Sequence, residues 1–132
     1  MSKKDIVVKF NKITKDLLDD MKNIIGKNYI NQFNLIIRMN STLPISKFKL
    51  NVLKFKNYIF DKNSEYFENE NIIINFINNN EELIKEKEYY LNEYYNLKNI
   101  YININDESKD NFWDILKVLI YLCENYHNKE IL

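Results

Sequence analysis

The chain has 132 residues, of which 45% are hydrophobic and 14% aromatic, and its 19 basic side chains are balanced by 19 acidic ones. This length predicts a single domain that spans residues 1–132. The balanced charge excludes the strong attraction to nucleic acid or to an anionic membrane that a basic protein would show. The single cysteine excludes an internal disulfide and is typical of a reducing compartment, so we expect a cytoplasmic location.

Two features of the sequence argue against a membrane. Residues 1–12 lack the apolar core of a signal peptide, because only Ile6, Val7 and Val8 are consecutive apolar residues there. The longest apolar run, residues 118–123, is too short to cross a bilayer.

The residue usage is strongly biased. The chain contains 23 Asn, 20 Ile and 18 Lys, but no Ala and only one Gly, one Pro and one Arg. The codons of the first group are rich in A and T, whereas those of the second group are mostly rich in G and C. The bias therefore indicates an AT-rich genome, such as that of a giant virus, an apicomplexan parasite, a social amoeba or a low-GC bacterium.

The first half of the chain shows the periodicity of amphipathic helices. Apolar residues at helical spacing predict a first helix over residues 6–24, which Gly26 should end because glycine adopts the left-handed conformation at low cost. Residues 28–39 predict a second helix. Residues 41–44, STLP, predict the start of a third helix with a hydroxyl cap and a proline in its first turn.

The second half continues the pattern. The apolar stripe of the third helix should end near residues 61–63; it consists of Ile45, Phe48, Val52, Phe55 and Ile59. Residues 72–78, IIINFIN, are ambiguous: β-branching favours a strand, but a single strand has nothing to pair with, so we predict a short buried helix. Residues 81–102 predict a long helix, and Asp106 or Ser108 should cap the last one.

These elements predict an all-α fold, a single-domain bundle of five to six helices. The side chains expected in its core include Phe10, Leu17, Phe48, Phe55, Leu116 and Leu119. The last helix raises a question, because residues 108–123, SKDNFWDILKVLIYLC, are apolar on almost every side except for a strip at Asp114, Lys117, Tyr121 and Asn125. Either this helix is central in the bundle, or one of its flanks is an interface with a partner.

No pattern in the sequence predicts catalysis, a cofactor or a metal. Gly26 is the only glycine, so phosphate-binding loops are excluded. Cys123 and His127 share a helix face, but two ligands do not make a zinc site. Cys123 also falls on an apolar stripe, where a thiol is unreactive.

The best candidate for nucleic-acid contact is KFKLNVLKFK, residues 47–56, which mixes aromatic residues with Lys47, Lys49, Lys54 and Lys56. On a helix these lysines flank the apolar stripe, which is also the ordinary arrangement at the edge of a core. Nucleic-acid binding is therefore the alternative function.

Tyrosines are concentrated in EYYLNEYYNLKNIY, residues 88–101. Helical spacing predicts an inner stripe of Leu83, Tyr90, Tyr94, Leu97 and Tyr101. Tyr89 and Tyr95 fall on other faces and should be partly exposed, and exposed tyrosine is common at interfaces. Together with Trp113 on a flank of the last helix, they are the predicted contacts with a protein partner.

Three segments resemble a family. Residues 10–21 (FNKITKDLLDDM), 64–84 (SEYFENENIIINFINNNEELI) and 108–123 look like the opening, middle and late helices of uncharacterised small all-α proteins of large nucleocytoplasmic DNA viruses, such as mimivirus relatives. In these proteins a tryptophan followed by leucines marks the late helix, as Trp113, Leu116 and Leu119 do here. The chain differs at residues 22–30, which contain no proline. The resemblance implies a viral protein of the host cytoplasm or the virion, and it implies no site residue.

The sequence thus favours a non-enzymatic protein that binds a protein partner or associates with itself. The alternative is a nucleic-acid-associated accessory factor that uses the lysines of residues 47–56.

Overall fold

The computed structural model describes residues 1–131, except for the side chains at positions 64, 66, 130 and 131. These residues form helices and short connections, with no strand among them, which confirms the all-α prediction. The helices, α1 to α10 with one 3-10 turn η1, are more numerous than the five or six expected. Three predicted helices are broken, and this accounts for much of the difference. The first of them, predicted over residues 6–24, is divided at Met21.

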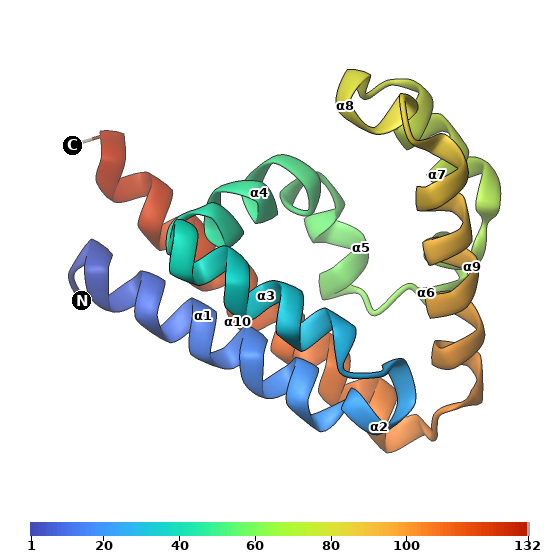
Figure 1. Cartoon of the computed structure of the whole chain (residues 1–132), viewed down its shortest axis with the longest axis horizontal. Helices are drawn as coiled ribbons and strands as arrows, with labels where there is room; N and C mark the ends of the chain where they lie inside the picture. The colour runs from blue at the N-terminus through green and yellow to red at the C-terminus, as the bar shows by residue number, and fades with distance from the viewer. Residues whose placement is uncertain (132) are drawn as a thin grey trace.

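The amino-terminal helices form one side of a main helical body (Figure 1). Their bounds are α1 Lys3–Asp20, α2 Lys22–Ile25 and α3 Asn28–Met39. The Ser2 hydroxyl accepts a hydrogen bond from the Asp5 amide and caps α1. Gly26 has φ 87°, so glycine ends α2 in the left-handed region, as predicted.

The predicted third helix is broken at Val52. The structure contains instead α4 Leu43–Asn51, η1 Leu53–Phe55 and α5 Lys56–Phe60. A straight helix would aim Phe48 and Phe55 in one direction, but the break lets the chain line two neighbouring core clusters. Phe48 packs against both clusters, whereas Phe55 and Ile59 belong to the one around Trp113. Pro44 lies in the first turn of α4 as predicted, but the expected hydroxyl cap is wrong, because Thr42 makes no side-chain capping bond.

An arm of four helices follows and stands to one side of the main body (Figure 1). Its elements are α6 Ser64–Glu68, α7 Glu70–Asn78, α8 Glu81–Ile84 and α9 Lys87–Asn103. Residues 72–78 are helical within α7, which settles the ambiguity of the sequence. The predicted helix over residues 81–102 is broken at Lys85 and Glu86, within the charged run KEKE, which has no apolar side chain to hold a continuous helix against a core.

The last helix, α10 Asp106–Ile131, runs antiparallel to α1 through the main body (Figure 1). Its cap is neither Asp106 nor Ser108, because the Ser108 amide donates to the Asn105 side-chain oxygen at 2.8 Å. Asparagine lies one residue before the helix, where its oxygen reaches the third amide of the first turn.

The chain itself covers most of α10. Its buried side chains lie against α1, α4 and α5: they are Trp113, Leu119, Ile120, Leu122, Cys123 and Tyr126. On the predicted polar strip Asp114, Tyr121 and Asn125 are exposed and Lys117 is half-buried, and Val118 is the exposed apolar residue beside it. The last helix is therefore central, and both of its flanks are largely occupied.

The core confirms part of the predicted burial. Phe10 and Leu119 are buried, whereas Leu17, Phe48, Phe55 and Leu116 are half-buried. Phe10 and Phe48 join α1 to α4 edge to face, with ring centroids 5.3 Å apart. The half-buried residues show that the sequence identified the inner faces of the helices but not how completely each would be covered.

Candidate binding cleft

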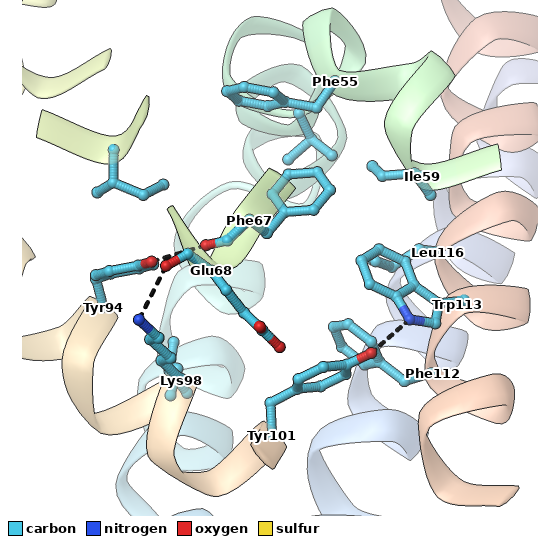
Figure 2. A pocket seen from close by; sticks show the side chains of 13 residues that line it. Phe55, Ile59, Phe67, Glu68, Tyr94, Lys98, Tyr101, Phe112, Trp113 and Leu116 are labelled. Carbon is cyan, nitrogen blue, oxygen red and sulfur yellow. Dashed lines mark hydrogen bonds between the residues drawn. The ribbon is translucent and has the colours of Figure 1, made fainter. Parts of the chain in front are cut away.

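An apolar cavity opens where the arm meets the main body (Figure 2). Its volume is about 350 Å³, within the range of ligand sites. We call it the aromatic cleft. It is lined by Val52, Phe55, Ile59, Phe67, Glu68, Ile73, Tyr94, Leu97, Lys98, Tyr101, Phe112, Trp113 and Leu116.

The arm supplies one wall through a single stripe of α9. Tyr94, Leu97, Lys98 and Tyr101 follow one another at intervals of three, one and three residues, so they share one helix face. The opposite wall comes from α10 and from the segment after the break at Val52. Because these elements meet only after the chain has folded, the cleft has no continuous sequence signature.

Aromatic rings form a connected arc around the cleft. Phe67 lies 5.6 Å from both Phe55 and Trp113, measured between ring centroids, and Trp113 lies 5.6 Å from Phe112 and 6.0 Å from Tyr101. Most of these pairs are edge to face, the arrangement that ring quadrupoles favour. The arc fixes the rings without filling the space between them.

Two hydrogen bonds join polar groups of the wall to one another (Figure 2). Trp113 Nε1 donates to the Tyr101 hydroxyl at 2.8 Å, and the Tyr94 hydroxyl donates to the Phe67 carbonyl at 2.7 Å. Burial, followed by the negative charges of Glu70 and Glu68, raises the pKa of Tyr94, so this hydroxyl keeps its proton. These bonds leave the inner surface apolar.

Two charged groups lie at the edge of this apolar surface. Lys98 Nζ donates to the Glu68 main-chain carbonyl at 2.9 Å. The Glu68 carboxylate extends away from that carbonyl toward Tyr101 (Figure 2), and no hydrogen bond or ion pair joins it to another described residue. The cleft therefore presents one cation and one anion beside an otherwise apolar interior.

The structure places the three predicted partner contacts in different surroundings. Trp113 is 6% exposed and lies in the cleft wall, whereas Tyr89 is 52% exposed on α9 outside the cleft. The Tyr95 hydroxyl donates to Glu70 at 2.5 Å, and this bond raises the pKa of Tyr95. The prediction thus named one residue of the cleft and missed its partners on α9. The sequence assigned Tyr94, Leu97 and Tyr101 to an inner stripe, but it did not show that a cavity would remain between this stripe and α10.

The four predicted nucleic-acid contacts do not form a shared basic surface of unpaired cations. Lys47 lies 3.3 Å from Glu82, and Lys56 lies 3.0 Å from Glu124. Lys54 lies over the ring of Phe76, 4.1 Å from its centroid, and Lys49 is exposed. Intramolecular partners thus already neutralise two of the four charges.

Cys123 and His127 approach the same main-chain group. Cys123 Sγ donates to the Ile45 carbonyl at 3.5 Å, and His127 Nε2 lies 3.5 Å from the same oxygen. Burial raises the pKa of Cys123 to about 11, since it outweighs the lowering by Lys49, so the thiol stays protonated at neutral pH. Within the described part of the chain, no three His, Cys, Asp or Glu side chains come together in a way that could hold a metal.

None of the helices within residues 1–131 combines the length and the apolar character needed to cross a bilayer. No family model matches the chain, and neither the curated proteins nor the solved structures contain a match to it. The viral resemblance stays a prediction, and the aromatic cleft is the feature on which a functional proposal rests.

Proposed function

We propose that the chain is a non-enzymatic interaction protein that binds a partner protein by accepting an apolar side chain in the aromatic cleft. The observation that carries the proposal is an open cavity lined mostly by apolar side chains, in which the Trp113 indole N–H and the Tyr94 hydroxyl bond within the wall. Such a site can bury an apolar side chain of matching shape. Catalysis would need a positioned acid, base or nucleophile beside the substrate.

Burial of one partner side chain in the cleft would release enough free energy to anchor the complex. An aromatic side chain buries roughly 150–250 Å², which corresponds to about 4–6 kcal/mol at about 25 cal/mol per Å² before the entropy of association is subtracted. A few residues of this kind carry most of the binding energy in protein interfaces. Exposed apolar residues of α9 other than the control position would add contact area; they are Tyr89, Tyr95 and Leu97.

A matched pair of variants tests the proposal. Leu97 lines the cleft and is 43% exposed, whereas Ile102 lies on the same helix, is 48% exposed and does not line the cleft. Leu97→Glu should place a charge in the apolar wall and abolish partner binding, and Ile102→Glu should not. Circular dichroism and thermal unfolding would show that both variants keep the fold.

The measurement is affinity capture from cells of the source organism with each immobilised protein, followed by sedimentation of the purified chain. A partner retained by wild type and Ile102→Glu but lost by Leu97→Glu supports the proposal. Equal capture by all three proteins would contradict it. Sedimentation as a dimer that Leu97→Glu converts to a monomer would identify a second copy as the partner.

A further inference from the structure

The aromatic cleft is large enough for a complete aromatic side chain. An apolar cavity of about 150 Å³ in a protein takes up benzene, and the cleft measures about 350 Å³. One indole or phenol ring would fit and leave room for its attachment to a main chain.

The walls favour an aromatic occupant over an aliphatic one. Six of the lining side chains are aromatic: Phe55, Phe67, Tyr94, Tyr101, Phe112 and Trp113. All of these except Tyr94 belong to the arc, in which most ring pairs meet edge to face. Aromatic pairs are stabilised by about 0.5–1.5 kcal/mol beyond the area they bury, which corresponds to about 2- to 10-fold in affinity.

The charged groups at the edge of the cleft match a peptide main chain. The Glu68 carboxylate accepts hydrogen bonds only, and the Lys98 ammonium has three donors, one of which reaches the Glu68 carbonyl. A main chain offers the complementary pair, an N–H for the carboxylate and a carbonyl for the ammonium. A free hydrocarbon offers neither.

The same groups argue against a second copy as the occupant. The exposed aromatic side chains Tyr89 and Tyr95 lie inside α9, and Tyr121 lies inside α10. Inside a helix the main-chain N–H groups are already bonded to carbonyls. Among the described residues, the exposed aromatic side chains therefore lack a free main-chain N–H beside them, whereas an extended segment would offer one to Glu68.

We infer that the aromatic cleft binds an extended, non-helical peptide segment of a partner protein through one aromatic side chain. In the bound state the ring lies against the arc, a main-chain N–H donates to the Glu68 carboxylate, and a main-chain carbonyl accepts from Lys98. The inference rests on the proposed function and names the chemistry of the partner.

Trp113 makes a direct test available because it is the only tryptophan and lies in the cleft wall. Its indole N–H gives one resolved nuclear magnetic resonance signal in the ¹⁵N-labelled full chain. The probes are N-acetylphenylalanine N-methylamide, its cyclohexylalanine analogue and toluene. We expect the phenylalanine probe to shift the Trp113 signal with a Kd of about 1 mM, as its size permits, and the cyclohexyl probe to bind about 2- to 10-fold more weakly. Equal or tighter binding of the cyclohexyl probe would overturn the aromatic preference.

The main-chain contact is tested with Glu68→Gln, and Glu70→Gln is the control because Glu70 lies outside the cleft and bonds Tyr95. Glu68→Gln should weaken the phenylalanine probe about 2- to 10-fold and leave toluene unchanged. Glu70→Gln should change neither. Equal loss for toluene, or no loss for the amide probe, would contradict the assigned role of Glu68.

The two proposals fail separately. If Leu97→Glu abolishes capture of a partner but the phenylalanine probe does not shift Trp113, the peptide inference is wrong and the interaction function stands. If the probe binds as expected but no partner depends on Leu97, the interaction function is wrong and the chemistry of the cleft stands.

Discussion

Trp113 and Tyr101 form the hydrogen-bonded pair that joins the arm to the main body within the cleft wall. The Trp113 ring is almost fully buried, and its only N–H donates to the Tyr101 hydroxyl at 2.8 Å. A buried donor without a partner costs the desolvation energy of that group. The Tyr101 hydroxyl therefore satisfies the one buried donor at this junction, beside the ring contacts of Phe67 with Phe55 and Trp113.

Tyr101→Phe should lower the free energy of unfolding by about 1–3 kcal/mol, because it leaves the Trp113 N–H unpaired while keeping the ring. Tyr95→Phe is the control: it removes a hydroxyl that bonds Glu70 at the surface, where water can replace the bond, so it should lower stability less than Tyr101→Phe does. Urea unfolding of the three proteins would measure the difference. Equal losses in both variants would show that the pair does not hold the arm.

Cys123 should make stability depend on alkaline pH. Its pKa is raised from 9.0 to about 11, so the folded protein keeps a proton that the unfolded chain loses. The resulting stability is fully present below about pH 9 and is lost as the pH rises toward 11. Unfolding measured across this window should show a steeper loss for wild type than for Cys123→Ala.

The same burial protects the thiol from reagents. Iodoacetamide should modify Cys123 at neutral pH only after unfolding in urea, because the reactive thiolate is absent and the side chain is covered. Rapid modification of the folded protein would contradict its placement beneath α4.

At the scale of elements, the caps and breaks decide where each helix begins and ends. Asn105 caps α10, although Asp106 and Ser108 were the predicted caps, and all three residue types are good helix starters. Adjacent candidates cannot be separated by residue preference alone. Which of these residues caps α10 depends on the position at which the chain leaves the arm and enters the main body.

Asn105→Ala should therefore lower stability by about 0.5–2 kcal/mol, whereas Ser108→Ala should have little effect. Thermal unfolding of both variants beside wild type would measure this. A larger loss for Ser108→Ala would restore the cap predicted from the sequence.

At the scale of the whole molecule, burial is distributed unequally between the main body and the arm. The main body holds two clusters of buried side chains around α1, α4 and α10, whereas α9 has no fully buried residue and α7 has one, Ile77. The Tyr29 hydroxyl donates to the Glu93 carboxylate and ties α3 to α9; this bond, with burial, raises the pKa of Tyr29 to about 12. Few apolar contacts between α3 and α9 accompany this hydrogen bond.

Amide hydrogen exchange should reflect this distribution. Residues 6–10 of α1 and 119–123 of α10 should exchange slowest, near the limit of global unfolding, and α8 and α9 should exchange faster through local opening. Uniform protection across all helices would contradict a loosely held arm. A bound phenylalanine probe should slow exchange in α9 more than in α1.

The net charge of zero and the paired lysines lead to a further expectation for the whole molecule. Binding of single-stranded DNA or RNA should be weak and nearly independent of salt, and Lys47→Glu with Lys54→Glu should not change it. Micromolar affinity that falls steeply with salt and is lost in this double variant would favour the alternative nucleic-acid function.

The sequence by itself determined the all-α class, the second helix over residues 28–39, the glycine stop and the inward faces of α1 and α10. These features are local: they depend on helical spacing, backbone preferences and the absence of any partner for a strand. Only the tertiary structure decided the breaks at Val52 and Lys85, the cap at Asn105 and the aromatic cleft. The physical reason is that the breaks and the cleft depend on contacts between residues far apart in the chain, and the cap is a choice among neighbouring residues of similar preference. Tyr101 was correctly placed on an inner stripe, but whether α10 would fill the space before it depended on how the arm docks.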